Sequence, residues 1–380
     1  MRIVVTGAAG FIATNLLERL LAQGHEVHGI DNFFLGKREY IARSLEKPGF
    51  TFHEFDLLDR DRVVALFQRL RPELVWHLAA NSDISYGTSY TDFDLKGGTL
   101  VTYNLLEAMR VSNTKQLIFS SSGAIYGEPA ILPTPENYGP LFPISFYAAS
   151  KIACETLITA FTAGYQMKCW MFRFGNIVGA YPTHGVIHDF VLKLQRDPTR
   201  LEILGDGTQS KPYVHVEDCL DGMMFGHATA VDSVNCFNLA VSDWTSVNQI
   251  AEWTIEAMGL DPSKVEITRT GGSRGWPGDV PKVRLDTSRM TALGWTPKMG
   301  SNEAVRRAIK ETVGQFGAAL RSARYCAACA MKASRLRALF GICSALVRKS
   351  FASAGEIALA VRSSATPSER LLACSRPRPR

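Results

Sequence analysis

The stretch that most constrains the fold is TGAAGFIATN (6–15), which joins a short apolar run to a segment with helical spacing. The run RIVVTG (2–7) is typical of a buried strand, and FIATNLLERLLAQG (11–24) carries apolar residues at helical intervals. Gly7 permits a tight turn between them, and Gly10 lets the backbone approach an anionic group at the start of the helix. The stretch therefore predicts the strand–turn–helix unit that opens a dinucleotide-binding α/β fold.

The same alternation continues along the chain. Apolar runs typical of strands occupy residues 26–31, 50–56, 74–80, 115–122, 168–176 and 235–240, with helical spacing at 60–71, 97–111, 147–164, 185–198, 246–259 and 294–316. This order predicts an α/β fold with a Rossmann-like, doubly wound parallel sheet. We expect a dinucleotide-binding domain over 1–176, to which a strand near 235–240 returns, and a smaller C-terminal α/β substrate-binding region over 177–317.

Charge separates the last 63 residues from the rest of the chain. The tail, 318–380, holds 12 Lys and Arg, 2 Asp and Glu and 15 Ala, which leaves 30 basic and 34 acidic residues in 1–317. The basic excess is thus confined to the tail, and we expect no nucleic-acid partner. We expect the tail to be poorly ordered, to be able to touch an acidic surface, and to be dispensable for activity.

Several classes of protein are disfavoured. No apolar run reaches the roughly 18–20 residues that span a bilayer, and MRIVVTG runs into a strand pattern without a secretory signal, so we expect a cytoplasmic protein. The 8 cysteines suggest no disulfide framework, and no acids or histidines have metal-ligand spacing. His77 and His215 are expected to be packed and hydrogen-bonded, and no metal site is predicted.

An acidic residue marks the cofactor end. Asp31 ends the second predicted strand, roughly 20 residues beyond the glycine turn, where a carboxylate accepts hydrogen bonds from a ribose diol. The same carboxylate repels a 2′-phosphate, and the first basic residue after it is Lys37. The sequence therefore predicts NAD in preference to NADP.

The stretch SFYAASKIACE (145–155) places Tyr147 and Lys151 one helical turn apart, downstream of a strand that ends in three serines. A phenol with a pKa near 10 is a poor base at neutral pH, but the lysine ammonium and the positive nicotinamide ring both favour the phenolate. Lowering the pKa by three units takes about 4 kcal/mol. The pattern predicts a tyrosinate that removes an alcohol proton while a hydride leaves for NAD⁺, with a serine orienting the alcohol.

Over about 1–316 the chain resembles the extended short-chain dehydrogenases/reductases, in the branch of nucleotide-sugar epimerases and dehydratases. The resemblance rests on TGAAGFIA, Asp31, HLAA (77–80), SSSGAIYG (120–127), YAASK (147–151), RFGNIVG (173–179), GDGTQSKPYVHVED (205–218) and DTSRMTALGW (286–295). It implies that the catalytic residues are Ser122, Tyr147 and Lys151. It implies a cofactor site formed by Gly7, Gly10, Phe11, Ile12, Asp31, Asn32, Asp56, Leu57, Leu78, Ala79, Ala80, Tyr147 and Lys151.

The resemblance further implies a nucleotide-diphosphate sugar as substrate and a homodimer formed through helices near 97–111 and 147–164. The substrate residues that it implies are Ser122, Asn176, Lys211 and Arg274. Three positions depart from the family pattern: Lys211 replaces an arginine, Arg274 lies two residues from the place of another, and Leu95 replaces an asparagine. These departures suggest a sugar other than galactose or a nucleotide other than UDP.

The residues after Ser122 bear on which sugar reaction to expect. In this family, 4,6-dehydratases carry an Asp–Glu pair there, decarboxylating members keep the glutamate, and 3,5-epimerases use a nearby cysteine; this chain has Gly123 and Ala124. What remains resembles the UDP-galactose 4-epimerases, which implies epimerisation at C4 through a transient 4-keto sugar. Another nucleotide-sugar oxidoreductase or dehydratase stays open, as does, more remotely, a non-catalytic NAD-responsive binding protein.

Overall fold

The computed structural model of the 380-residue chain describes residues 1–272 and 284–317, so Arg274 and the predicted tail lie outside the described residues. Its main sheet has seven strands, in the order β11-β6-β5-β4-β1-β2-β3, and every neighbouring pair is parallel. The strands are β1 (Arg2–Thr6), β2 (Glu26–Asp31), β3 (Phe50–Glu54), β4 (Leu74–His77), β5 (Gln116–Ser122), β6 (Lys168–Phe174) and β11 (Val234–Leu239). The prediction of a doubly wound parallel sheet is confirmed.

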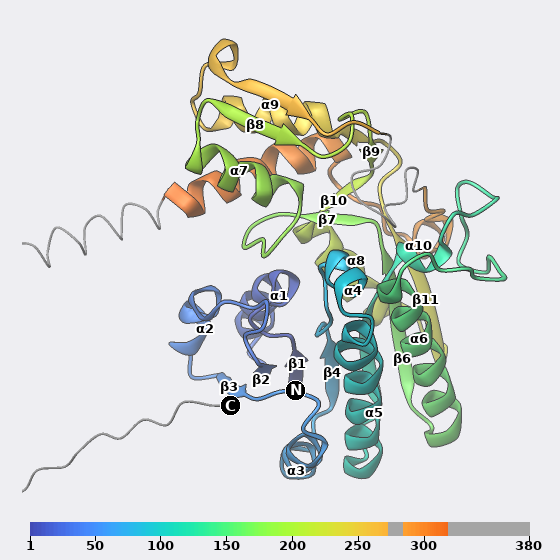
Figure 1. Cartoon of the computed structure of the whole chain (residues 1–380). Helices are drawn as coiled ribbons and strands as arrows, with labels where there is room; N and C mark the ends of the chain where they lie inside the picture. The colour runs from blue at the N-terminus through green and yellow to red at the C-terminus, as the bar shows by residue number, and fades with distance from the viewer. Residues whose placement is uncertain (273–283, 318–380) are drawn as a thin grey trace, which may run out of the picture. The chain divides into compact units, whose positions relative to one another are not determined.

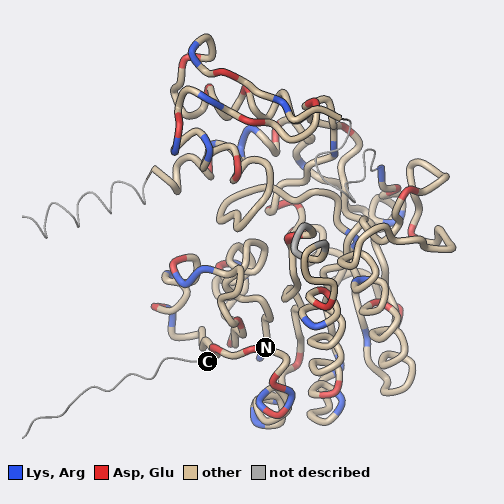
Figure 2. The backbone as a smooth tube through the Cα atoms, viewed as in Figure 1, with Lys and Arg blue, Asp and Glu red and all other residues tan. Residues whose placement is uncertain are grey.

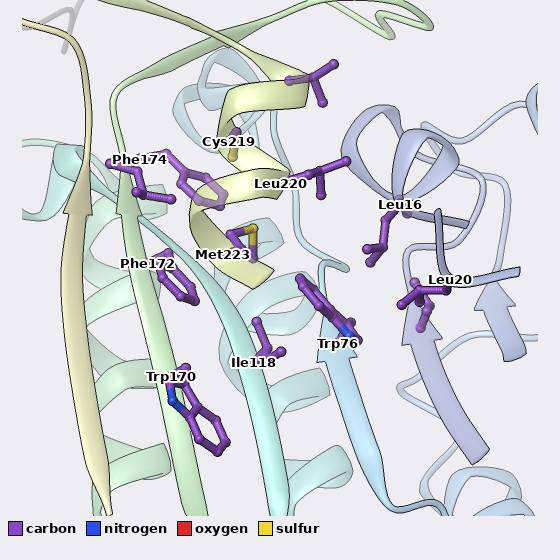
Figure 3. Close-up of a cluster of buried hydrophobic side chains, with 14 of the residues drawn as sticks. Leu16, Leu20, Trp76, Ile118, Trp170, Phe172, Phe174, Cys219, Leu220 and Met223 are labelled. Carbon is purple, nitrogen blue, oxygen red and sulfur yellow. The ribbon is translucent and has the colours of Figure 1, made fainter. Parts of the chain in front are cut away.

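Helices cover both faces of this sheet, which is why its strands read as nearly continuous apolar runs (Figure 1). One face packs against α3 (Arg60–Leu70), α5 (Val101–Ser112) and α6 (Phe146–Tyr165), and the other against α1 (Phe11–Ala22) and α8 (Val216–Thr229). Figure 3 shows the second face, where Leu220 and Met223 of α8 and Leu16 of α1 lie over Trp76 and Phe172 of the strands.

A further apolar cluster belongs to residues that follow the sixth strand. It joins α7 (Val186–Arg196), α9 (Val247–Ala257), a helix over 301–317 and the parallel pair β8 (Arg200–Ile203) and β13 (Glu266–Arg269). A capping box formed by Ser246 and Gln249 fixes the start of α9. The helices expected at 185–198 and 246–259 are confirmed, and the one expected at 294–316 begins at 301.

The sixth predicted strand divides in two. Gly175 donates its N–H to Leu239 O at 2.8 Å and ends the pairing of β6, whereas Asn176 donates to Pro212 O at 3.3 Å. The chain therefore leaves the main sheet and starts β7 (Asn176–Val178), which pairs in parallel with β10 (Tyr213–His215). The other short elements are η1 (Arg38–Tyr40), α2 (Ala42–Leu45), α4 (Ile84–Ser89), η2 (Leu95–Leu100), η3 (Gly123–Tyr126), β9 (Ser210–Lys211), β12 (Thr245–Ser246), η4 (Pro262–Lys264) and α10 (Ser288–Leu293).

Basic and acidic residues are interspersed over the described part of the chain, as Figure 2 shows. His77 and His215 are both buried and hydrogen-bonded, as expected: His77 contacts Thr6 Oγ1 at 2.7 Å, and His215 contacts Glu311 Oε2 at 3.1 Å. None of the helices in residues 1–272 and 284–317 is long and apolar enough to cross a membrane.

Candidate active site

A cavity of about 990 Å³ lies at the carboxyl ends of the central strands. Its lining includes the residues that follow β1, β2, β4, β5 and β6. Strand β1 lies between β2 and β4, so the strand order reverses at this point, where an open α/β sheet leaves a crevice for ligands. The volume is at the upper end of the range for small-molecule sites, as a dinucleotide together with a second ligand requires.

Every described residue that the sequence assigns to a site lines this one cavity. They are Gly7, Gly10, Phe11, Ile12, Asp31, Asn32, Asp56, Leu57, Leu78, Ala79, Ala80, Ser122, Tyr147, Lys151, Asn176 and Lys211. The fold thus brings together residues up to about 200 positions apart in the sequence.

The glycine turn forms one wall of the cavity. Gly7 has a φ of +67°, and a Cβ built on it would lie 2.8 Å from Ala79 N, in the loop after β4. Gly10 is the N-cap of α1 and makes no side-chain cap, so the N–H groups of the first turn are not covered by a capping side chain. A helix start of this kind fits an anionic pyrophosphate, because both the N–H groups and the helix dipole favour negative charge.

Asp31 is buried at the end of β2, and backbone hydrogen bonds fix the orientation of its carboxylate. Its Oδ2 accepts from Ala9 N at 3.0 Å and its Oδ1 from Phe33 N at 2.7 Å. Burial raises the pKa of Asp31, and hydrogen bonds from the backbone of Phe33 and Ala9 oppose that rise. The backbone of Asn32 also bonds to this carboxylate, which leaves about one acceptor site for a ribose hydroxyl. Together with the glycine turn, Asp31 makes the cavity fit a dinucleotide.

The catalytic candidates lie at the ends of two packed elements. Ser122 closes β5, and its Oγ accepts from Ala124 N at 3.1 Å, which leaves the hydroxyl proton free to be donated. Tyr147 lies in the first turn of α6, whose N-cap is Ser145. A side-chain hydrogen bond with Ser122 acts to lower the pKa of Tyr147. The two hydroxyl groups therefore meet inside the cavity.

Lys151 is 4% exposed and tightly held. Its Nζ donates to Ser120 O at 2.6 Å and lies 4.7 Å from the ring centre of Phe119 and 5.8 Å from that of Tyr147. Burial lowers the pKa of Lys151 to about 8, although the charges of Cys154 and Glu155 act in the opposite direction. The lysine thus carries most of its positive charge at neutral pH, next to the phenol.

The expected lowering of the Tyr147 pKa is not the direction that the structure gives. Burial raises the pKa of Tyr147 to about 12, and the charge of Asp94 adds to that rise. The sequence-based expectation counts two cations, Lys151 and the nicotinamide ring, whereas in the protein alone the cost of charging a phenol away from water decides the direction. The tyrosine consequently needs more positive charge than Lys151 supplies before it can act as a base.

Sequence reasoning missed a polar group that lines the cavity near Ala80. Ser82 and Asp83 follow β4, and His184 follows β7; all three line the cavity, and Ser82 Oγ lies 3.4 Å from His184 Nδ1. Burial lowers the pKa of His184. The polar run NSD (81–83) directly after a buried strand was a usable signal for the first two residues, whereas no pattern in the sequence marks His184.

Comparison with known proteins agrees with this geometry. The model of the NAD dependent epimerase/dehydratase family matches residues 3–240. The chain is 31% identical over 317 residues to the UDP-glucose 4-epimerase of Mycolicibacterium smegmatis, which covers 82% of this chain and 98% of that protein. Two solved structures, each 31% identical in sequence, are similar to this chain. The Thermotoga maritima UDP-glucose 4-epimerase with UDP-glucose has a TM-score of 0.74, and the match covers 84% of this chain and 100% of that one. The Thermus thermophilus UDP-glucose 4-epimerase complex with NAD has a TM-score of 0.72, and the match covers 83% of this chain and 99% of that one. The chain belongs to the NAD dependent epimerase/dehydratase family.

Proposed function

We propose that this protein is an NAD-dependent epimerase that inverts C4 of a nucleotide-diphosphate sugar through a transient 4-keto sugar. The observation that carries the proposal is that Ser122, Tyr147 and Lys151 line the same cavity as the glycine turn and Asp31. Bound NAD supplies a hydride acceptor, a hydride donor and, when oxidised, a positive ring. The residues of the chain have to bind the sugar, orient its alcohol and move one proton.

The proton moves at the Tyr147 hydroxyl. A phenol whose pKa is about 12 releases its proton when further positive charge is brought close, and Lys151 supplies part of that charge. The phenolate takes the proton of the C4 alcohol, and Ser122 donates a hydrogen bond that orients the same oxygen. The protonated Tyr147 later returns its proton to the 4-keto oxygen.

The cavity beyond these three residues is proposed to hold the rest of the substrate. Asn176 and Lys211 line it, and the lysine provides one positive charge for a diphosphate, without the two-pronged geometry of an arginine. Gly123 and Ala124 also line the cavity next to Ser122 and provide no acid or base for removing water. This favours epimerisation over elimination. Arg274, assigned to the same role, lies outside the described residues.

We further propose that the chain has two functional parts: residues 1–176 form the domain that binds the dinucleotide, and residues 177–317 form the region that binds the sugar nucleotide. A homodimer through helices near 97–111 and 147–164 is supported by apolar side chains exposed on these helices, among them Val111 and Tyr165. Equilibrium sedimentation tests it. Cytoplasm is the proposed compartment, since both NAD and nucleotide sugars are supplied there.

The test of the reaction is proton NMR on a panel of nucleotide sugars. Purified protein saturated with NAD is expected to interconvert a pair of C4 epimers without net formation of NADH. Accumulation of NADH in step with a keto or acid product would show a dehydrogenase instead, and a dehydrated sugar would show a dehydratase. Binding of NAD without conversion of any sugar would contradict enzymatic function.

Asp31→Asn should weaken binding of NAD and lessen the preference over NADP. The change keeps the shape of the side chain but removes the charge that attracts the ribose hydroxyls and repels a 2′-phosphate. We expect the Kd for NAD to rise roughly 10-fold, as loss of a charge-assisted hydrogen bond implies, and the Kd for NADP to change less. Calorimetric titration with both cofactors gives the ratio of the Kd for NADP to the Kd for NAD. If this ratio were the same in Asp31→Asn as in the wild type, this role for Asp31 would be ruled out.

A further inference from the structure

A buried ion pair lies behind the catalytic residues and does not line the cavity. Glu155 on α6 and Arg173 on β6 are 7% and 8% exposed. Arg173 Nε donates to Glu155 Oε1 at 3.0 Å and Nη2 donates to Oε2 at 2.7 Å. Burying two charges costs about as much as their attraction returns, so apolar residues of similar volume often stabilise a fold equally well. A fully formed pair at this place therefore calls for a reason other than stability.

Glu155 continues the row of catalytic side chains along α6. It follows Tyr147 and Lys151 at intervals of four residues, so the three side chains share one face of the helix. That face meets the three serines that end β5 (120–122). Ser120 O accepts from Lys151 Nζ at 2.6 Å, Ser121 Oγ donates to Glu155 Oε1 at 2.5 Å, and the side chain of Ser122 bonds to that of Tyr147. Each serine thus fixes one turn of the helix.

Arg173 ties this contact to the next strand and to the segment after Ser122. It is the register partner of Ser121 in the pairing of β5 with β6. Its Nη1 donates to Tyr126 Oη at 2.9 Å and to Glu136 O at 2.7 Å. One guanidinium therefore holds β6, η3, the loop that follows it and, through Glu155, helix α6. These are the elements whose relative placement sets the distance between Tyr147 and Ser122.

We propose that Glu155 and Arg173 are positioning residues that set the depth of α6 against β5, so that Tyr147 meets Ser122. The proposal rests on the proposed function, because it takes Tyr147 as the group that moves the proton. A displacement of about 1 Å in a reacting group costs a rate factor of about 100.

The charge of Glu155 gives the pair a second effect that packing alone would not have. Burial lowers the pKa of Lys151, while charges on Cys154, Glu155 and Asp94 oppose that change. Burial also raises the pKa of Cys154, so its thiol is neutral at neutral pH. This leaves Glu155 and Asp94 as the carboxylates that keep the lysine protonated, with Arg173 bonded to Glu155.

The first test is Glu155→Gln, which keeps the volume and an oxygen for Ser121 while removing the charge. We expect kcat to fall 10- to 100-fold with KM changed less than threefold. Without the carboxylate the pKa of Lys151 should drop by about one unit, so that activity is lost at a lower alkaline pH than in the wild type. NMR titration of ¹³C-labelled lysine, assigned with Lys151→Met, reads this pKa without any turnover.

The second test is the double variant Glu155→Met with Arg173→Met, which leaves no lone buried charge. Its melting temperature should stay within a few degrees of the wild type while kcat remains at least 10-fold lower. Glu107→Gln is the matched control, since Glu107 is 8% exposed and bonded to Arg110 on α5 but does not line the cavity. It should keep the wild-type kcat and pH profile.

The outcomes separate this proposal from the proposed function. A folded double variant with wild-type kcat, or an unshifted Lys151 titration in Glu155→Gln, would overturn the positioning role. If the wild type converts no sugar on the panel, the proposed function fails, while the lysine titration still decides whether Glu155 controls Lys151.

Discussion

Replacing Tyr147 with phenylalanine is expected to lower kcat by about 10³-fold while NAD still binds and the protein melts at its usual temperature. The change removes one oxygen, the atom proposed to take and return the proton of the C4 alcohol. The phenyl ring keeps the place of the phenol ring, 5.8 Å from Lys151 Nζ. The charge of Lys151 then has no phenolate to stabilise, although Ser122 can still orient the sugar oxygen.

Proton NMR of the sugar measures the loss of kcat, and a separate titration with NAD shows whether the cofactor still binds. Tyr165→Phe is the matched control, because Tyr165 lies at the other end of the same helix, is 43% exposed and does not line the cavity. It should turn over like the wild type. A Tyr147→Phe protein with normal kcat would show that another group moves the proton, and Asp83 and His184 would then be the residues to examine.

Gly7→Ala should remove cofactor binding and destabilise the fold. Gly7 has a φ of +67°, which costs an L-residue about 1–2 kcal/mol. In addition, the new methyl group would lie 2.8 Å from Ala79 N and 2.9 Å from Ala79 Cα. Both are backbone atoms, which cannot rotate out of the way as the end of a flexible side chain can. We expect the free energy of unfolding to fall by about 2–5 kcal/mol in total, since crowding of a packed site adds about 1–3 kcal/mol.

The chain offers a control that separates the two causes. Gly24 has a similar φ of +77° at the end of α1, but a Cβ built there meets nothing within 4 Å. Gly24→Ala should therefore cost only the conformational part, about 1–2 kcal/mol, and leave NAD binding unchanged. Urea unfolding and NAD titration of both variants give the comparison. Equal effects at the two positions would show that the close approach of Ala79 has no influence.

Much of the site could be predicted from the sequence because its parts are marked by patterns of a few neighbouring residues. The glycine turn, Asp31 at the end of the next strand, and the interval between Tyr147 and Lys151 each depend on only a few neighbouring residues. The alternation of strand and helix then placed all of them at one edge of the sheet, since the carboxyl ends of parallel strands meet there. All but Arg274, which lies outside the described residues, line the cavity.

Other features depend on which elements pack together, and no local pattern carries that information. The pKa of Tyr147 is raised because burial outweighs the hydrogen bond with Ser122. Strand β6 ends at Phe174 because the next two N–H groups have partners in different segments: Gly175 donates to Leu239 O and Asn176 to Pro212 O. His184 came to the cavity from a segment with no recognisable signal.

The sequence by itself determined the fold class and pointed to the glycine turn, Asp31 and the tyrosine that is proposed to move the proton, because periodicity and spacing act within a few residues. Only the tertiary structure decided how far Tyr147 and Lys151 are desolvated. It also decided that Arg173, on a strand, pairs with Glu155, on a helix 18 positions earlier in the sequence. The reason is that desolvation and long-range pairing depend on the three-dimensional neighbours of a group, and these exist only once the layers have packed.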